Sequence, residues 1–406
     1  MADRPEASGR CPRLATLAEH ESQQCRTTGA GEKPLMIPKW IRTKSMLVCA
    51  FACSAHGMFG AGRCSDALAQ RSVCEPANAF ASNLIKSRHL EAVSVVQDVS
   101  TGTLVLFAAS ERAKLDVSTP VLPLSLSKVF LAASWWDHNE PDLKFESLHG
   151  SENAVNPAYR KSVNVHEILV GGSDSAGRQM AIALRKTVGT EVVLGDLRRY
   201  GFNGGNESFW ADVDPQWRKQ LTPRPADASL SGLNDEEWSS ALSIGESHMT
   251  ISALQVSRFF QAVGNDGLSC SPVALRTQDG HSRTPNKSCS APTRMMTETA
   301  AKQLMSALVD TVKRGTATGI SGTLIGTGWS IGGKTGTGGV AGAPFEDQDG
   351  WFAGLIFDGS LKARYTVATF VRHGGAGGGK AAEISAEEAR FLAGGSGAKP
   401  GTPSLP

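Results

Sequence analysis

The sequence predicts an α/β fold, because strand-like segments lie near both ends of the chain and mainly helical segments lie between them. Residues 93–99 and 103–109 alternate apolar and polar side chains around a short turn, which is typical of a β-hairpin. Residues 351–357 and 365–372 repeat this arrangement, and an amphipathic helix is predicted over 381–393. The 406 residues are 40% hydrophobic, which is typical of a globular chain with a large core.

The first helix after the amino-terminal hairpin carries a Ser-x-x-Lys motif made by Ser125 and Lys128. Pro123 precedes the motif, and residues 129–136 are apolar nearly all round, which indicates a buried helix. Ser125 and Lys128 then share one helix face. A serine hydroxyl becomes nucleophilic when a neighbouring base accepts its proton, and a partly desolvated lysine amine can be that base. Taken alone, the motif more often marks an exposed lysine beside a helix-capping serine.

The second motif, Ser173-Asp174-Ser175, follows a predicted helix over residues 166–170 and two glycines. Because successive glycines oppose a helix, we expect this triplet on a loop between two helices. A Ser-Asp-Ser sequence is also typical of a helix cap, and that alternative stays open at this point.

The third motif ends a predicted strand over residues 329–337 and consists of Lys334, Thr335, Gly336 and Thr337. Gly336 leaves no side chain between the backbone and a ligand, so an extended substrate could lie alongside as an added strand. Lys334 would supply a cation for a carboxylate. The backbone N–H groups of Thr337 and Ser125 would form an oxyanion hole. The alternative is a glycine-rich turn with a surface lysine.

In this order, the three motifs resemble the signature of penicillin-binding proteins and serine β-lactamases. Residues 91–393 resemble the transpeptidase domain of high-molecular-weight penicillin-binding proteins. Residues 241–255 are similar to that family's S-I-G-Q-G…T-P-L-Q segment, residues 314–317 to its G-T-A turn, and residues 350–354 to its W-F-x-G strand. The resemblance implies a five-stranded antiparallel sheet covered by helices, plus a mainly helical subdomain, with the active site at their junction.

The resemblance also implies a role for each motif. Ser125 is the expected nucleophile and Lys128 its base, while Ser173 is the expected proton shuttle between Lys334 and the leaving amine. Ser175 occupies a position where the family usually carries Asn. A hydroxyl cannot supply an amide's donor and acceptor together, so substrate anchoring at Ser175 departs from the family pattern.

Three function classes follow from the resemblance. The first is a D,D-transpeptidase or carboxypeptidase acting on D-Ala-D-Ala ends of peptidoglycan stem peptides through an acyl-serine intermediate. The second is a serine β-lactamase, and the third is a non-catalytic binder of β-lactams or muropeptides. We expect the first class with a long-lived β-lactam adduct, because no segment resembles the class A deacylating glutamate or the class D Tyr-Gly-Asn strand.

Composition limits the partners. The net charge of +2 with 20% charged residues gives no indication of nucleic-acid binding, and none of the cysteine spacings suits a metal. The family resemblance implies peptidoglycan stem peptides and β-lactams as ligands, and we expect no cofactor.

The predicted organisation has four parts. Residues 1–35 are a polar tail or an over-extended start, with translation beginning at Met36 instead. Residues 36–69 read as a signal peptide or membrane anchor, since basic residues precede an apolar run and small residues follow it. Residues 70–393 form the catalytic domain, and 394–406 a disordered tail. We expect export to the periplasm or the outer face of the cytoplasmic membrane, with membrane attachment only if the segment is uncleaved.

Cysteine usage fits an exported protein. Five of the eight cysteines precede the proposed cleavage site, which leaves Cys74, Cys270 and Cys289. Cys270 and Cys289 bracket a polar stretch that reads as a surface insertion, and a disulfide closing it would stabilise the fold by about 3 kcal/mol. Two unrelated buried thiols are the alternative. Cys74 is then expected to be free or in an intermolecular bond.

Overall fold

The computed structural model describes residues 64, 72–111, 115–138, 143–148, 160–203, 212–221, 226–275, 289, 292–339 and 342–394. The predicted tail 1–35, the predicted signal segment apart from Cys64, and residues 395–406 lie outside the described residues. The described residues all belong to one compact unit of the chain. Across these ranges, no helix combines the length and apolar character needed to span a bilayer.

A five-stranded antiparallel sheet forms the centre of the fold, in the order β11-β12-β13-β1-β2. The strands are β1 (Glu91–Asp98), β2 (Leu104–Ala109), β11 (Ser330–Gly338), β12 (Asp349–Phe357) and β13 (Ala363–Arg372). Both predicted hairpins are present, and they are joined where β1 pairs with β13, from Glu91 opposite Arg372 to Asp98 opposite Tyr365. The predicted fold class is therefore confirmed, with the strands of the two ends in one sheet.

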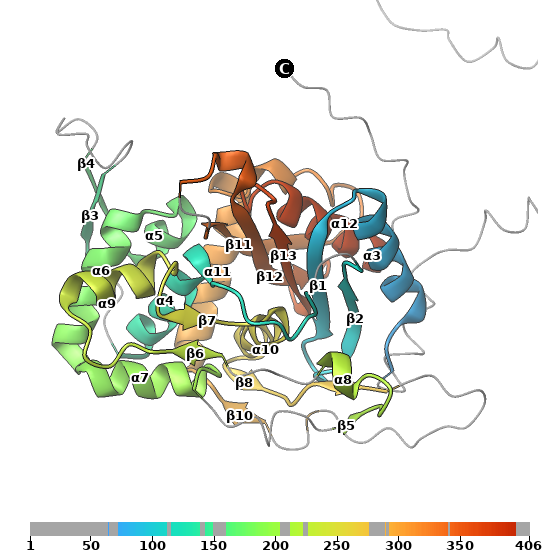
Figure 1. Cartoon of the computed structure of the whole chain (residues 1–406), viewed down its shortest axis with the longest axis horizontal. Coiled ribbons are helices and arrows are strands. Elements are labelled where there is room, and N and C mark those ends of the chain that lie inside the picture. Colours follow the sequence, from blue (N-terminus) through green and yellow to red (C-terminus); the bar gives the residue numbers. More distant parts are fainter. Residues whose placement is uncertain are drawn as a thin grey trace, which may run out of the picture. The chain divides into compact units, whose positions relative to one another are not determined.

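Helices cover both faces of this sheet (Figure 1). They are α3 (Glu75–Ser87) and α12 (Lys380–Leu392) on one face, and α10 (Ala253–Gly264) and α11 (Glu298–Arg314) on the other. Alternation along β1 explains this, since Val93 and Val95 belong to the core beside α10, whereas Ala92 and Val96 belong to the core beneath α12. A sheet buried on both faces requires apolar side chains in both directions.

The mainly helical part lies to the left of the sheet in Figure 1. Its helices are α4 (Ser127–His138), α5 (Val165–Gly171), α6 (Asp174–Val188), α7 (Thr190–Arg199) and α9 (Asp235–Ser243). The short helix α8 (Arg218–Leu221) lies apart from them, at the lower right of Figure 1. Short 3-10 turns are η1 (Leu124–Leu126), η4 (Thr318–Ile320) and η5 (Phe345–Asp347). Short strands are β3 (Phe145–Leu148), β4 (Arg160–Val163), β5 (Asp212–Val213), β6 (Asp227–Ala228), β7 (Met249–Thr250), β8 (Leu268–Ser269), β9 (Val273–Ala274) and β10 (Thr293–Arg294).

The placement of the middle motif on a loop is wrong. Ser173 is the N-cap of α6 and its hydroxyl accepts a hydrogen bond from the Ala176 N–H, so Asp174 and Ser175 form the first turn of the helix. The two glycines do end α5, because Gly172 adopts a left-handed conformation as its C-cap. Only the two cap residues, Gly172 and Ser173, separate the two helices, and the acidic side chain of Asp174 suits a helix N-terminus.

Two disulfides are present among the described cysteines. One joins Cys270 to Cys289, the pairing that the sequence predicts. The other joins Cys64 to Cys74, so the expectation of a free or intermolecular Cys74 is wrong. The sequence argument assigned Cys64 to the removed segment, whereas the fold holds Cys64 against the fully buried Cys74 that precedes α3. Cleavage after residue 69 would remove Cys64 and this bond.

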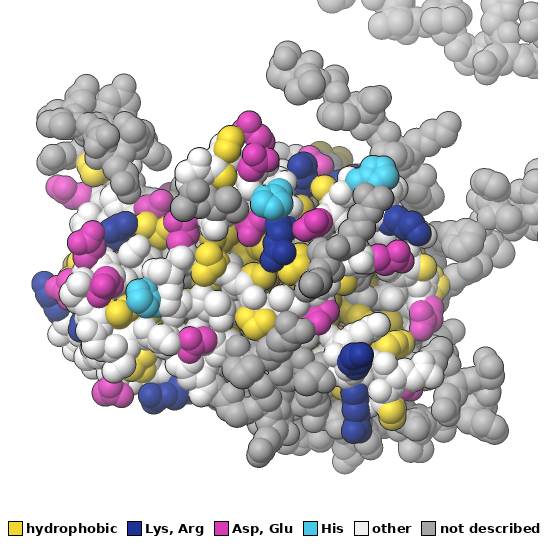
Figure 2. All heavy atoms as spheres, viewed as in Figure 1, with side chains coloured by type: hydrophobic (Ala, Val, Ile, Leu, Met, Phe, Trp, Pro, Cys, Tyr) yellow, Lys and Arg dark blue, Asp and Glu magenta, His cyan; other side chains and the backbone are white. Residues whose placement is uncertain are grey.

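Charged side chains of both signs are interspersed on the face shown in Figure 2. This distribution fits the small net charge of +2.

Candidate active site

The structure brings the Ser-x-x-Lys motif together at the start of a buried helix. Ser125 lies in η1, and Lys128 is the second residue of α4, whose side chains are buried on all faces from Ser127 to Trp136. Lys128 is therefore fully buried, and its Nζ lies 3.1 Å from the Ser125 Oγ. Burial lowers the pKa of Lys128 from its usual value, and the negative charge of Asp174 opposes part of that shift. A lysine with a lowered pKa beside a serine hydroxyl has the chemistry of a general base.

Two further acceptors hold the Lys128 amine. Its Nζ lies 2.5 Å from Asp174 Oδ1 and also donates to the backbone carbonyl of Ser243. Asp174 comes from the first turn of α6 and Ser243 from the last residue of α9, so three separate helices converge on one nitrogen. The Asp174 side chain is 46% exposed, which leaves one side of this cluster open to solvent.

A strained turn positions Ser125. Leu124, which directly precedes it, has a φ of +53°, a conformation that non-glycine residues rarely adopt. The Leu124 N–H donates to the Gly245 carbonyl at 3.1 Å, and a Cβ placed on Gly245 would lie 2.2 Å from the Leu124 carbonyl oxygen. Gly245 also has a φ of +73°. The segment after α9 therefore packs closely against the turn that carries Ser125, and this close approach requires glycine at position 245.

The third motif lies on β11 beside Ser125. A Cβ placed on Gly336 would lie 3.4 Å from the Ser125 backbone nitrogen and 3.2 Å from the Leu124 Cβ. Gly336 thus lets the strand run past the serine turn. The Lys334 side chain is buried and its Nζ donates to the Thr335 carbonyl at 2.8 Å. Burial, reinforced by the neighbouring charge of Lys128, lowers the pKa of Lys334 to about 7.

The threonines of this motif contact the segments on either side of β11. The Thr335 Oγ1 lies 2.6 Å from the Thr316 Oγ1, and Thr337 Oγ1 accepts from the Gly377 N–H at 2.9 Å. The Thr316 N–H in turn donates to the Val170 carbonyl of α5. The turn at residues 314–317 therefore links the Lys334 strand to the helix that precedes the middle motif.

The middle motif meets the site in an unexpected way. The Ser173 Oγ lies 2.7 Å from the Ser147 Oγ, and the Ser175 Oγ accepts from the Leu148 N–H at 3.0 Å, so both hydroxyls bond to β3. Within the described ranges, no hydrogen bond is found from Ser173 to Lys334. The residue before Ser173 does approach Lys334, because a Cβ on Gly172 would lie 3.8 Å from the Lys334 Nζ.

Three residues near the site, Asp174, Gly245 and Glu246, were given no role from the sequence. Asp174 contacts the base directly, and Glu246 Oε1 accepts from the Gly339 N–H at 3.1 Å, next to the end of β11. An acidic residue inside the middle triplet was the available signal for Asp174. The contact joins residues 46 positions apart, so spacing in the sequence could not show it.

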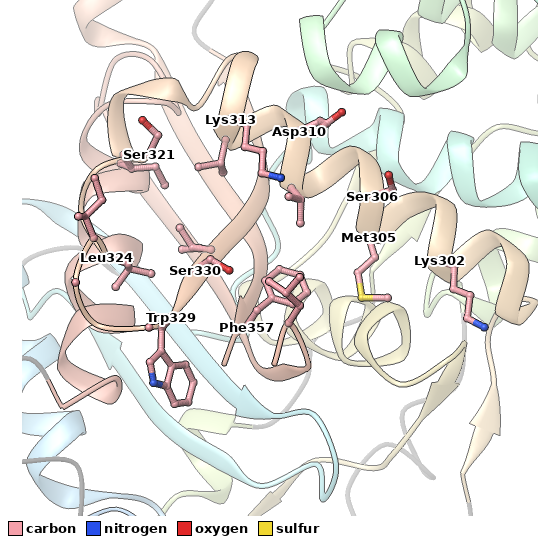
Figure 3. A pocket seen from close by; sticks show the side chains of 18 residues that line it. Lys302, Met305, Ser306, Asp310, Lys313, Ser321, Leu324, Trp329, Ser330 and Phe357 are labelled. Carbon is pink, nitrogen blue, oxygen red and sulfur yellow. The ribbon is translucent and has the colours of Figure 1, made fainter. Parts of the chain in front are cut away.

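A groove of about 770 Å³ lies beside the first residues of β11, away from the Lys334 motif. Figure 3 shows side chains that line it. It is formed by α11 and by residues 320–331, with Met305, Leu324, Trp329 and Phe357 among its apolar side chains. None of the motif residues lines it. Among the described residues, no group of three or more His, Cys, Asp and Glu side chains could hold a metal ion.

Comparisons with known proteins concern the fold and the carboxy-terminal part of the chain. Residues 222–389 match the family model described as the penicillin binding protein transpeptidase domain, a range that contains Lys334 but begins after Ser125, Lys128 and Ser173. No curated protein sequence matches the chain.

Solved structures show the same fold. The D,D-transpeptidase domain of a peptidoglycan glycosyltransferase from Eggerthella lenta is 18% identical, with a TM-score of 0.59 over 78% of this chain and 80% of that one. PBPA from Mycobacterium tuberculosis is 14% identical, with a TM-score of 0.60 over 78% and 79%. Penicillin binding protein 3 from the same organism, in complex with aztreonam, is 18% identical, with a TM-score of 0.57 over 78% and 76%. The predicted resemblance is therefore confirmed for the fold and for residues 222–389.

Proposed function

We propose that the chain is a serine acyltransferase of the D,D-transpeptidase or D,D-carboxypeptidase type, from the match of residues 222–389 to the penicillin binding protein transpeptidase domain and from the shared fold. The observation that carries the proposal is the buried Lys128 amine 3.1 Å from the Ser125 hydroxyl, beside a strand that ends in the Lys334 motif. Its substrates would be D-Ala-D-Ala ends of peptidoglycan stem peptides, and β-lactams would acylate the same serine.

In the proposed reaction, Ser125 Oγ attacks the substrate carbonyl carbon while its proton passes to the Lys128 amine. The N–H groups of Ser125 and Thr337 stabilise the resulting oxyanion, which the close passage of Gly336 past the Ser125 nitrogen supports. The substrate carboxylate binds at Lys334 and the threonines of its motif. The leaving amine receives its proton from Ser173, with Lys334 as the neighbouring source.

We also propose that the protein works outside the cytoplasm. Two disulfides support this, because structural disulfides persist in oxidising compartments. The predicted four-part organisation is proposed with one change: a signal peptide, if it is cleaved, ends before Cys64. Recovery of mature chains that begin after residue 64 would contradict this boundary.

Intact-mass spectrometry after mixing with a penicillin tests the function. We expect a single adduct on wild-type protein, no adduct on Ser125→Ala, and a rate of acylation reduced about 100-fold or more on Lys128→Ala. The adduct should persist for minutes or longer. Full turnover within seconds would move the assignment to a β-lactamase, and a wild-type protein that forms no adduct would leave only a non-covalent binder.

A further inference from the structure

We infer that Asp174 is a positioning residue that orients the Lys128 amine, so that the lone pair of its neutral form faces the Ser125 hydroxyl. The inference rests on the proposed function. It concerns the middle residue of the second motif, whereas the hydroxyl of the third residue, Ser175, accepts from the Leu148 N–H.

The hydrogen-bonding groups around the Lys128 nitrogen fix its orientation. A neutral amine has two N–H donors and one lone pair. Three oxygens of the described residues lie within hydrogen-bond distance of Lys128 Nζ, namely Asp174 Oδ1, the Ser243 carbonyl oxygen and Ser125 Oγ. An ionised carboxylate and a backbone carbonyl can only accept, whereas a serine hydroxyl can also donate. The two N–H groups therefore point at Asp174 and Ser243, and the lone pair is left for the Ser125 O–H.

Proton transfer then needs no rearrangement of these partners. When Ser125 Oγ attacks, its O–H bond breaks and a bond to the carbonyl carbon forms. The proton becomes the third N–H of the Lys128 ammonium, whose other two donors keep Asp174 and Ser243 as acceptors. Since the site is buried around Lys128, a fixed acceptor pair costs less reorganisation than a mobile shell of water would.

The backbone of α6 supports the same geometry independently. Gly177 lies one turn after Asp174, and a Cβ on Gly177 would lie 3.3 Å from the Lys128 Cε and 3.0 Å from the Ser243 Cβ. The Lys128 side chain thus passes closely along α6 toward the carboxylate of Asp174. The N-cap at Ser173 fixes the start of the helix, which in turn fixes where Asp174 projects.

Charge and orientation make separable contributions. The charged groups near the amine are Asp174 and Arg178 on α6, Glu246 after α9, and Lys334 on β11. Asp174 raises the pKa of Lys128 against the larger effect of burial. Asp174→Asn keeps an acceptor oxygen and removes the charge, so the neutral amine should persist to lower pH. Asp174→Ala removes the charge and the acceptor together.

The test measures the second-order rate constant of penicillin acylation from about pH 5 to about pH 9. We expect Asp174→Ala to lower the high-pH plateau by about tenfold or more, because a misoriented base remains misoriented when it is neutral. Asp174→Asn should stay within about threefold of the wild-type plateau and shift the acidic midpoint of the profile to lower pH.

Asp235→Ala is the matched control. Asp235 is the first residue of α9, just as Asp174 is the first residue of α6, but its side chain pairs with Arg185 and does not contact Lys128. It should leave the profile unchanged. Wild-type plateau rates in Asp174→Ala, an equal loss in Asp174→Asn, or an equal loss in Asp235→Ala would each overturn the inference. If Asp174→Ala fails to fold, Asp174→Leu, which keeps the shape and lacks an acceptor, takes its place with the same criteria. An absence of adduct on wild-type protein is the separate failure of the proposed function.

Discussion

The buried carboxyl group of Glu388 makes the stability of this protein depend on pH. Glu388 lies on α12 with its side chain fully buried against the sheet, where its Oε2 accepts from the Ser94 hydroxyl at 2.8 Å. Its Oε1 has no hydrogen-bond partner among the described residues. Burial, with a small addition from the charge of Glu387, raises the pKa of Glu388 to about 8. We expect Glu388→Gln to stabilise the protein above neutral pH.

The magnitude follows from the difference between the folded and unfolded pKa values. Between its usual value of 4.5 and about 8, the folded chain holds a proton on Glu388 that the unfolded chain has lost. The free energy of unfolding therefore falls as the pH rises through this window. Each pKa unit corresponds to about 1.4 kcal/mol, which gives a loss of roughly 3 kcal/mol at pH 7 and roughly 5 kcal/mol above pH 8.

Glutamine cannot ionise and nearly preserves the shape of the side chain. Its amide oxygen can accept from Ser94, and its NH₂ group would stand where the protonated acid already lacks a partner. Glu388→Gln should therefore match the wild-type protein within about 1 kcal/mol near pH 5, and gain on it by about 1.4 kcal/mol for each further pH unit up to 8.

Urea unfolding followed by circular dichroism at intervals from about pH 5 to about pH 8 measures this difference. Glu383→Gln is the control, because Glu383 lies on the same helix but is exposed, with its carboxylate paired to Arg88. A difference between Glu388→Gln and wild type that stays constant over the whole pH range would refute the reasoning. So would an equal pH-dependent gain in Glu383→Gln.

Three further predictions concern the site and its surroundings. Gly245→Ala should reduce penicillin acylation at least tenfold, because its Cβ would lie 2.2 Å from the Leu124 carbonyl; labelling with a fluorescent penicillin at the wild-type rate would contradict this. Peptide mapping without reductant should recover Cys270 linked to Cys289, and replacing both with serine should lower the free energy of unfolding by about 3 kcal/mol; two free thiols would refute the pairing. Since the pKa of Lys334 is about 7, its side chain loses its charge above that pH. The initial non-covalent complex with a carboxylate-bearing penicillin should therefore weaken as the pH rises past 7. A dissociation constant that does not change with pH in stopped-flow experiments would exclude carboxylate binding by Lys334.

The strands and the motif order could be predicted from the sequence because they depend on neighbouring residues. Alternation along residues 93–99 and 365–372 requires only that successive side chains point to opposite faces of a strand. The three-residue spacing of Ser125 and Lys128 brings both to one face within a single turn. The fold class followed from these local patterns, and the resemblance of ordered motifs supplied the five-stranded sheet.

The same local reasoning failed where two signals competed. Two glycines before Ser173 correctly predicted a helix end, but the capping capacity of Ser173 immediately begins the next helix. Cys64 was assigned to a removed segment because of the apolar pattern before it. Its disulfide partner is Cys74, the N-cap residue of α3, and that pairing depends on the folded structure.

The sequence by itself determined the hairpins at the two ends of the chain and the side chains that carry the candidate chemistry, because those properties belong to a few adjacent residues. Only the tertiary structure decided how these side chains act on one another. Lys128 acquires Asp174 and Ser243 as acceptors from helices 46 and 115 positions away in the chain. Glu388 is buried because α12 packs on β12 and β13, where its carboxyl group also reaches the Ser94 hydroxyl of β1. Burial and long-range contacts set pKa values and orient lone pairs, and neither is encoded in local spacing.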